Sequence, residues 1–342
     1  MLLVLVFSIS IRAQDVHYSQ FYALPTTLNP ALTGFFQGPY RLAGIYRSQW
    51  AGFAPFLTQS VSGEWKVRPR PDEKDPNKSD VVGIAALLTN DKAGIDAGIS
   101  TMKAYFSMAV NIDLGFMHLG IGAQPGYVQR NLFGVNRFPD QWDEIRNVFD
   151  PMVATQEQYS NNVGYFDLNG GLLGTKVFGE EVRHSAYVGY SAFHILRPRE
   201  EFVAATINNI TPVRHVLHFG GRIRTGVSRP ISIVPSGIFM WIPASAAKER
   251  NFGVDVEYDF KQVNSSFSGK WILGGYKRIY DSWIIHTAME VNDFLVGFSY
   301  DINSSELKEA SGMKGGFEIS VRYTPLPVRQ IKRLDSNPCP HI

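Results

Sequence analysis

The strongest constraint on the fold is an alternation of apolar and polar side chains that begins at residue 40 and continues almost to the end of the chain. Successive side chains of a strand point to opposite faces, so a period of two predicts strands with one apolar and one polar face. The division is complete over 252–260, where the faces read Phe252, Val254, Val256, Tyr258 and Phe260 against Gly253, Asp255, Glu257 and Asp259. Segments 100–111, 293–301 and 317–323 show the same pattern.

Three features favour a transmembrane barrel over a soluble β-sandwich. The alternating segments are about 9–13 residues long, which suits a tilted membrane strand and exceeds the usual soluble strand. Aromatic residues recur at the ends of apolar faces, as at Phe317 and Tyr323, and the polar faces carry charges of both signs. We predict an all-β fold, a transmembrane antiparallel β-barrel of about 14 strands (roughly 12–16). The predicted strands are 40–49, 56–66, 81–90, 98–113, 115–127, 164–176, 183–195, 213–226, 230–243, 251–261, 268–280, 282–292, 293–302 and 315–325.

The apolar residues 2–11 are too few to span a bilayer as a helix but suit the core of a signal peptide. We predict a signal peptide over 1–14, with a buried N-terminal strand as the alternative. No later stretch approaches the roughly 18 uninterrupted apolar residues of a membrane helix. A membrane protein with this sequence is therefore expected to be a closed barrel, because lipid cannot satisfy an open sheet edge.

The residues before the first strand contain several breakers of regular structure, among them Pro25, Pro30 and Gly34. Such a segment suits the inside or the mouth of a barrel better than its wall. The predicted division of the chain is a signal peptide at 1–14, an N-terminal segment at 15–39 that plugs or caps the periplasmic side, the barrel at 40–325 and an extended periplasmic tail at 326–342.

The connections between the predicted strands indicate the orientation. Three long ones, 128–163, 196–212 and 303–314, fall on the same side of the barrel. Bacterial barrels carry their long loops outside and short turns in the periplasm, so this side is expected to face outward. The polar, Pro-rich connection 68–80 is the exception, because it is long and falls on the periplasmic side.

Composition excludes some functions. Lys and Arg (33) nearly balance Asp and Glu (31), whereas nucleic-acid-binding domains carry a marked basic excess. The single cysteine, Cys339, excludes an internal disulfide and zinc sites built from cysteines. The mean hydropathy of −0.10 is compatible with a barrel, because alternation hides the membrane face in the average.

Two short motifs look like metal sites but are better interpreted otherwise. His215 and His218 are three residues apart, so on a strand their side chains point to opposite faces. Residues 90–96 include Asn90, Asp91 and Asp96 but lack the alternating acidic positions and the closing glutamate of an EF-hand. We expect no metal and no cofactor, and a turn at 90–96.

Charged residues on the polar faces are expected to pair inside the barrel. Carboxylates in a row, as on the strand at 252–260, can serve acid–base catalysis, but unpaired charges in a confined lumen are costly, so ion pairing is favoured. The candidate lumenal charge network comprises Arg183, Arg214, Arg222, Arg224, Asp255, Glu257, Asp259, Glu318 and Arg322. No Ser–His spacing and no Gly-rich phosphate loop indicates an enzyme, and we predict no catalytic residues.

The first predicted strand carries the polar residues Arg41, Arg47 and Gln49 and is followed directly by Trp50. In one interpretation Arg47 braces the lumen and Trp50 lies at the outer membrane interface. In the other, the group binds the N-terminal segment or a protein partner.

Several motifs spread from the mature N-terminus to the C-terminus carry a resemblance to one family. They are 18–22 (YSQFY), 29–34 (NPALTG), 46–50 (YRSQW), 91–94 (DKAG), 271–276 (WILGGY) with Arg278, 297–301 (GFSYD), 316–320 (GFEIS) and 339–340 (CP). Together they resemble the PorP/SprF family of type IX secretion system outer-membrane proteins over essentially the whole chain. The chain departs from the family pattern at Phe317 and in lacking a final aromatic residue.

The resemblance implies a non-enzymatic barrel in the outer membrane of a Gram-negative bacterium that works with the secretion and gliding machinery. It implies binding of secreted surface adhesins through their C-terminal domain, and contact with periplasmic and outer-membrane components of the type IX system. The candidate structural or partner-binding residues are Ser19, Gln20, Asn29, Pro30, Gly34, Arg47, Gln49 and Trp50. An outer-membrane channel or transporter for small solutes or lipids is the alternative function, and a lipid-modifying barrel enzyme is a third.

Overall fold

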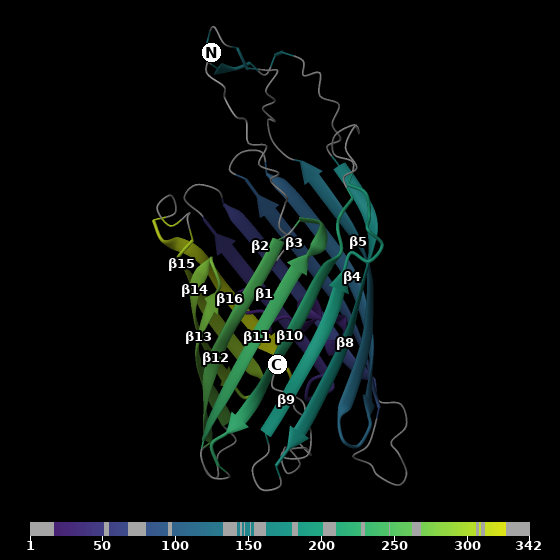
Figure 1. Cartoon of the computed structure of the whole chain (residues 1–342), viewed down its shortest axis with the longest axis vertical. Helices are drawn as coiled ribbons and strands as arrows, with labels where there is room; N and C mark the ends of the chain where they lie inside the picture. Colours follow the sequence, from purple (N-terminus) through teal and green to yellow (C-terminus); the bar gives the residue numbers. More distant parts are fainter. Residues whose placement is uncertain are drawn as a thin grey trace.

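The computed structural model describes residues 17–325 apart from gaps at 51–54, 68–79, 95–97, 133–141, 144–145, 147, 151, 154–161, 180–183, 201–209, 227–229, 246, 262–267, 306–307 and 309–311. The predicted signal peptide and tail, and most of connection 68–80, lie outside the described residues. Within the described residues, fourteen antiparallel strands form one closed barrel, in which β1 pairs with β16 (Figure 1). The predicted barrel is confirmed.

The barrel strands are β1 (Tyr40–Gln49), β2 (Phe56–Val67), β3 (Val81–Ala93), β4 (Ile99–Asp113), β5 (His118–Leu132), β8 (Asn162–Phe178), β9 (His184–Phe193), β10 (Arg214–Arg224), β11 (Ile231–Ile242), β12 (Ala247–Lys261), β13 (Ser268–Arg278), β14 (Ser282–Val291), β15 (Phe294–Asn303) and β16 (Lys314–Tyr323). Each strand pairs with the next along the chain, and β5 pairs with β8 across the longest connection. That connection holds a separate two-stranded sheet of β6 (Trp142–Asp143) and β7 (Val148–Phe149), which the sequence pattern did not predict.

Most predicted strand boundaries agree with the structure to within three residues. The larger differences are the end of β5, at Leu132 instead of 127, and the start of β12, at Ala247 instead of 251. The turn before β5 is closed by a hydrogen bond from the N–H of Leu114 to the carbonyl of Met117, so β5 starts at His118 instead of 115. The turn predicted at 90–96 is wrong in its first half, because β3 pairs with β2 as far as Ala93. Pro235 does not interrupt β11, where it lies opposite Val254.

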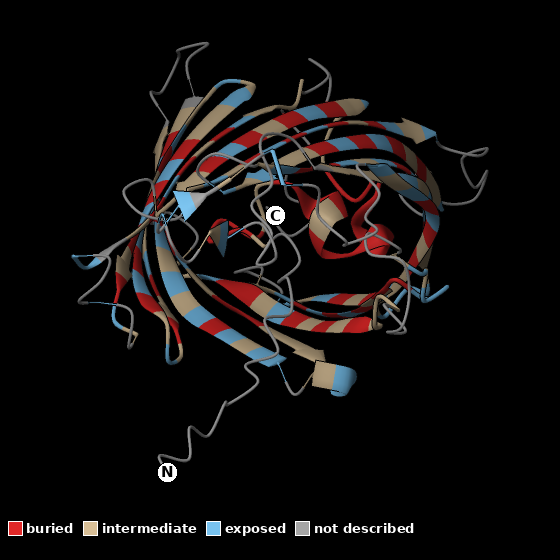
Figure 2. Ribbon diagram, turned by 90° about the horizontal axis from the view of Figure 1, so that it is seen from above, coloured by how far each residue is buried: buried red, intermediate tan, exposed pale blue. Residues whose placement is uncertain are grey.

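Burial alternates along the strands as the apolar and polar residues alternate in the sequence. In Figure 2 this alternation appears as stripes of buried and exposed residues along the strands. On β4, Met102, Phe106 and Met108 are exposed on the outer face, whereas Ser107 is buried on the inner face. Side chains that are exposed on the outside of a membrane barrel contact lipid, so an apolar outer face is stabilised by the bilayer itself. The polar inner face must find partners within the lumen.

The two ends of the barrel differ. We call the end where β1 finishes at Gln49 the loop end, because the connections β5–β8, β9–β10 and β15–β16 lie there. It is uppermost in Figure 1. We call the opposite end, where β1 begins at Tyr40, the turn end. Outer-membrane barrels carry their long loops on the outside, so we expect the loop end to be the outer end.

Residues 17–39 lie within the ring of strands, where the short helices α1 (Pro25–Leu28) and η1 (Pro30–Leu32) appear in Figure 2. Each of these helices begins with a proline, whose fixed φ suits the first helical position. We call residues 17–39 the lumenal segment. Within the described part of the chain, no helix has the length and apolarity needed to cross a membrane.

The lumenal segment runs along the barrel instead of capping one mouth. Near the loop end, Ser19 contacts Arg47 and Asp301, which lie close to the ends of β1 and β15. At the turn end, Gly34 packs on Gly83 near the start of β3. The predicted role of the segment, to plug or cap the periplasmic side, stays a prediction; the segment itself is not confined to that side.

Candidate functional site

Glu318 in the middle of β16 holds the beginning of the lumenal segment. The backbone N–H groups of Ser19 and Gln20 donate to its two carboxylate oxygens at 2.7 and 2.8 Å, and Arg47 of β1 donates to the same carboxylate. All four residues are buried. Because β1 and β16 are the strands that close the ring, these bonds join the segment to the seam of the barrel from inside.

The hydroxyl of Ser19 lies at the centre of a buried ion-pair cluster. Its Oγ donates to Asp301 Oδ1 at 2.6 Å and accepts from Arg47 Nη1 at 2.9 Å and Arg278 Nη2 at 2.8 Å. Arg278 Nη1 also donates to Asp301 Oδ2 at 3.1 Å. We call Ser19, Arg47, Arg278, Asp301 and Glu318 the anchor cluster. Its two guanidinium groups balance its two carboxylates, and removal of any one would leave an uncompensated buried charge.

The side chains beside Ser19 extend this attachment. Gln20 Nε2 donates to Ser299 Oγ at 3.2 Å, and its Oε1 accepts from Ser320 Oγ at 2.7 Å. The Tyr18 hydroxyl shares a 2.6 Å hydrogen bond with Ser60 of β2, and burial raises the pKa of this phenol. Tyr18 therefore stays protonated, and three successive residues of the YSQFY motif bond to inner-face side chains.

Asn29 fixes the middle of the lumenal segment to the opposite wall. Its Oδ1 accepts from the N–H of Ala31, which caps η1, and its Nδ2 donates to the carbonyl of Leu172 at 2.9 Å. The same amide lies 3.0 Å from Nε2 of the buried His218. His215, by contrast, faces outward and shares a hydrogen bond with Tyr190, so the two histidines point to opposite faces as predicted.

Glycines on the inner faces let the lumenal segment approach the wall at backbone distance. A Cβ added to Gly122 of β5 would lie 2.4 Å from the carbonyl carbon of Pro30. A Cβ on Gly83 of β3 would lie 2.3 Å from the carbonyl oxygen of Thr33. These distances are far below van der Waals contact, so the path of the segment requires glycine at both positions.

Gly34 ends the tightly packed part of the segment near the turn end. Its φ of +74° favours glycine, and its N–H donates to Glu64 Oε2 at 3.3 Å. Glu64 also accepts from Arg41 Nε at 2.8 Å, and the Arg41 guanidinium lies 4.7 Å from the ring centre of Phe36. The NPALTG motif is thus fixed to the barrel wall through its first residue, Asn29, and through its last, Gly34.

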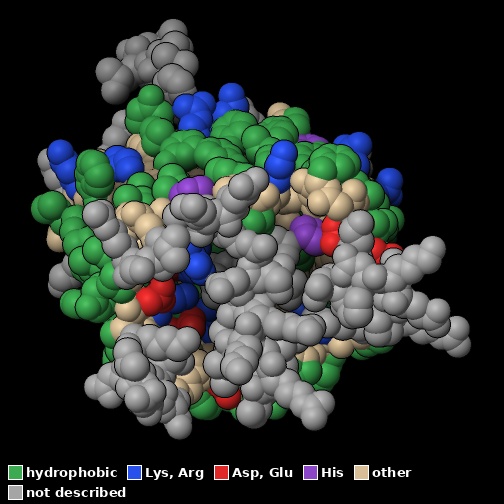
Figure 3. Space-filling model, turned by 90° about the horizontal axis from the view of Figure 1, so that it is seen from below, with side chains coloured by type: hydrophobic (Ala, Val, Ile, Leu, Met, Phe, Trp, Pro, Cys, Tyr) green, Lys and Arg blue, Asp and Glu red, His purple; other side chains and the backbone are tan. Residues whose placement is uncertain are grey.

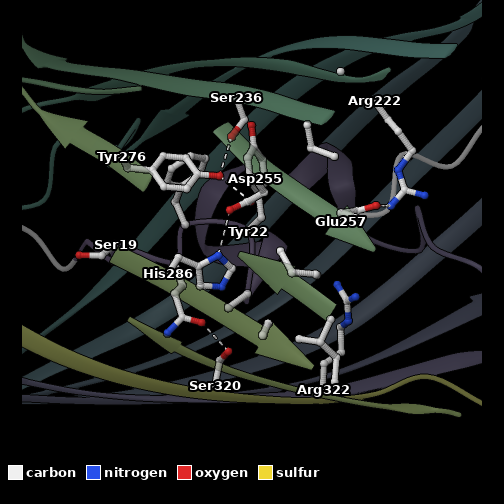
Figure 4. A pocket seen from close by; sticks show the side chains of 18 of the residues that line it. Ser19, Tyr22, Arg222, Ser236, Asp255, Glu257, Tyr276, His286, Ser320 and Arg322 are labelled. Carbon is white, nitrogen blue, oxygen red and sulfur yellow. Dashed lines mark hydrogen bonds and ion pairs between the residues drawn. The ribbon is translucent and has the colours of Figure 1, made fainter. Parts of the chain in front are cut away.

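A cavity of about 100 Å³ lies between the lumenal segment and the wall formed by β9 to β16 (Figure 4). At one side, Asp255 accepts from the hydroxyl of Tyr276 at 2.7 Å and lies 3.1 Å from Nδ1 of His286. Phe21 and Tyr22 of the segment form part of the lining. The lining combines aromatic, aliphatic and hydrogen-bonding groups, which is the mixture found in small-molecule sites.

The predicted lumenal charge network is divided into several groups. Glu257 accepts from Arg222 and lies 4.0 Å from Lys270 Nζ, while Arg322 pairs with Glu290 at 3.7 Å. Glu318 belongs to the anchor cluster. Seen from below, basic and acidic side chains lie in the opening and hydrophobic ones around the outside (Figure 3). Within the described residues, no group of three or more His, Cys, Asp or Glu side chains could hold a metal ion.

The remaining candidates lie apart from these groups. Arg214 stacks on Phe193, with its guanidinium carbon 4.3 Å from the ring centre. The half-buried residues Arg224 of β10 and Asp259 of β12 are near the turn end. Arg183 lies outside the described residues.

At the end of β1, Gln49 joins the lumenal contacts of Arg47, and Trp50 packs on a neighbouring aromatic ring. Gln49 accepts from Arg47 Nη2 at 3.2 Å, which connects it to the anchor cluster. Trp50 has a positive φ of 49° and packs edge-on against Phe56 with ring centres 5.7 Å apart. Pro30 packs against Gly122, as described above.

Two members of the anchor cluster belong neither to the predicted charge network nor to the candidate partner-binding residues. Arg278 is the last residue of β13, and Asp301 lies near the end of β15. Both belong to motifs that carry the family resemblance, WILGGY with Arg278 and GFSYD, so the signal was present in the sequence. The alternation places them on the inner face, but it does not indicate that they meet Ser19 of the lumenal segment.

We expect Asn29→Ala to destabilise the barrel by about 1–3 kcal/mol, because it removes the cap of η1 and leaves His218 and the Leu172 carbonyl without this amide. Thermal unfolding of the detergent-solubilised protein measures the effect. Thr27→Ala is the control, since the Thr27 hydroxyl bonds only locally to the carbonyl of Leu24. Equal losses in the two variants would contradict a special role for Asn29.

Comparison with known proteins identifies the family. Several solved structures are similar to the chain at 7–9% identity, all of those described here with TM-scores below 0.5. One is the CymD monoaromatic hydrocarbon channel, with 9% identity and a TM-score of 0.46; the match covers 89% of this chain and 93% of that one. Another is the toluene transporter TbuX of Ralstonia pickettii, with 9% identity and a TM-score of 0.45; the match covers 86% of this chain and 90% of that one. BamA from Haemophilus ducreyi lacking POTRA domains 1–3 is also similar, with 7% identity and a TM-score of 0.39; the match covers 84% of this chain and 70% of that one.

No curated protein sequence matches the chain. The family model for the type IX secretion system membrane protein PorP/SprF matches residues 10–323, nearly the whole length. Together with the closed barrel of fourteen strands, this match indicates an outer-membrane location. The chain therefore belongs to the PorP/SprF family of type IX secretion system membrane proteins.

Proposed function

We propose that this barrel is a non-enzymatic component of the type IX secretion and gliding machinery that binds secreted surface adhesins and machinery partners. The observation that carries the proposal is the occupation of the lumen by the chain's own segment, which is fixed by the anchor cluster and by Asn29. A lumen filled in this way favours partner binding at the mouths over free diffusion through the barrel. Adhesin cargo is expected at the loop end, and periplasmic partners at the turn end.

Exposed apolar side chains in the longest connection support cargo binding at the loop end. In the described part of that connection, Met152 is 89% exposed, and Trp142 and Val148 are 40% and 48% exposed. These residues lie beyond the membrane strands, where apolar exposure is not stabilised by lipid. Apolar groups in such a position are typical of protein-binding surfaces.

Site-specific photo-crosslinking in living cells tests the proposal. A photoreactive residue at Met152 is expected to crosslink to a secreted surface protein, because Met152 projects from the loop end. The same residue at Phe116, which is 67% exposed in the turn between β4 and β5, is the matched control at the turn end. Recovery of lipid alone, or the same products from both positions, would count against adhesin binding.

A channel or transporter for small solutes or lipids is the second candidate. The cavity between the lumenal segment and β9 to β16 favours it, because this side of the lumen is not filled by close packing. Conductance in planar bilayers separates the two functions. The binding proposal predicts a barrel that does not conduct ions. A steady, large conductance of the unmodified protein would favour the channel instead.

A further inference from the structure

Three cations face outward, toward the membrane, near the loop end of β12 and β13. Lys248 and Arg250 share the outer face of β12 with the exposed residues Phe252 and Val254. On β13, Lys277 lies opposite Phe252 and on the same face. Lys248 is the second residue of β12, and Lys277 is the second last residue of β13, so all three lie at the outer edge of the barrel wall.

Aromatic rings flank these cations and place them at the level of the lipid headgroups. On one side Phe239, Trp241 and His215 form a stack, with successive ring centres 5.1 Å apart. The Arg250 guanidinium lies 5.7 Å from the ring centre of Phe239, and Lys277 Nζ lies 4.5 Å from that of Trp283 on the other side. Tryptophans gather where a membrane barrel meets the headgroups, so this group marks the outer interface.

The outer face provides no counter-charge for these cations. Among the outward-facing residues of β11 to β14 that the structure describes, none is acidic. The neighbouring carboxylates of Glu249 and Asp281 both pair with Arg278 of the anchor cluster, at 3.3 and 2.9 Å. Three positive charges gathered at a membrane interface therefore attract an anion from outside the chain.

Below the cations the same surface is apolar. Val254 and Val256 continue the outer face of β12, and Leu273 that of β13, each of them 42–54% exposed. A ligand that fits must present negative charge at the interface and hydrocarbon beneath it. Phosphate suits this arrangement, since a guanidinium binds it through two parallel hydrogen bonds and an ammonium adds a mobile point charge.

We propose that Lys248, Arg250 and Lys277, with their flanking aromatic rings, form a binding site for the headgroup of a phosphorylated lipid of the outer leaflet. The phosphate groups contact the three cations, and the acyl chains lie along Val254, Val256 and Leu273. The site lies on the lipid-facing surface and is separate from the lumen. It does not depend on which partner the barrel binds.

Native mass spectrometry of the solubilised barrel with added diphosphoryl lipid A tests the site, with the dephosphorylated lipid as the comparison. The wild-type protein is expected to prefer the phosphorylated form. Replacement of all three cations by glutamine is expected to weaken its binding by about 100-fold, since each basic residue near a membrane surface contributes roughly tenfold or less. The charge-matched control replaces the dispersed, exposed cations Lys92, Lys176 and Arg197 by glutamine and is expected to bind as the wild type does.

Heat-dependent migration on gels establishes that each variant is folded. If the triple variant does not fold, the preference of the wild-type protein for the phosphorylated lipid, and its loss in high salt, still decide the matter. Equal binding of both lipids by the wild type overturns the proposal. An equal loss of lipid binding in the triple variant and in the control variant overturns the proposal as well. That result would mean that binding depends on the net charge of the protein and not on this site.

Discussion

Replacing Glu318 with alanine is expected to destabilise the folded barrel by about 3–5 kcal/mol, the usual cost of removing one member of a buried ion-pair cluster. The substitution leaves the N–H groups of Ser19 and Gln20 without their acceptor and leaves Arg47 without one of its two carboxylates. The seam between β1 and β16 loses the carboxylate to which both Arg47 and the lumenal segment bond, while the bonds of the segment to Arg47 and Ser320 remain. The segment is then expected to leave the lumen part of the time.

Two measurements check this expectation. Thermal unfolding gives the loss of stability, and planar-bilayer recording is expected to show transient openings that the wild-type protein lacks. Val321→Ala is the control, because Val321 lies on the outer face of the same strand and is 43% exposed. If Glu318→Ala unfolds at the wild-type temperature and stays closed, the anchor cluster does not hold the segment.

Gly83→Val is expected to have the largest effect on the path of the lumenal segment itself. Any Cβ at this position would lie 2.3 Å from the carbonyl oxygen of Thr33 and 2.6 Å from the Cα of Gly34, so one of two backbones must move. Strand β3 is held by both of its neighbours, whereas the lumenal segment is held mainly by side chains. The segment is therefore expected to move, with a cost above the roughly 1–3 kcal/mol of ordinary overpacking.

Limited proteolysis and bilayer conductance report whether the segment has been displaced. Gly275→Val is the matched control, because a Cβ at Gly275 on the outer face of β13 would meet no atom within 4 Å. We expect the control to unfold and conduct as the wild type does. Wild-type behaviour of Gly83→Val would mean that the segment and β3 do not lie in contact.

The barrel could be predicted from the sequence because its rule is local. Each strand must show lipid an apolar face and the lumen a polar one, and a period of two states this requirement at every position, as over 252–260. Strand ends were less accurate, since they depend on turns such as the one closed by Leu114 and Met117. The sheet of β6 and β7 pairs only two residues on each side, which is too short for a period to be recognised.

The interior of the barrel could be predicted only in part. Alternation places Glu318, Glu257 and Arg222 on inner faces, but it does not say which inner-face residues meet. Those contacts depend on strand order around the ring and on the course of an irregular segment that has no period. The contacts of Ser19 with Asp301 and Arg278 span 282 and 259 residues of sequence, and no local pattern indicates them.

The position of the lumenal segment limits the order in which the barrel can assemble. The segment passes through the ring and bonds to both strands of the seam, to Arg47 of β1 and to Glu318 and Ser320 of β16. A closed ring would have to be threaded by a chain that carries helical turns and bulky aromatic side chains. We therefore expect the segment to fold into place while β1 and β16 are still apart, so that β16, the last barrel strand along the chain, closes the ring around it. In this order of assembly the N-terminal residues act as a template for the final step of barrel closure.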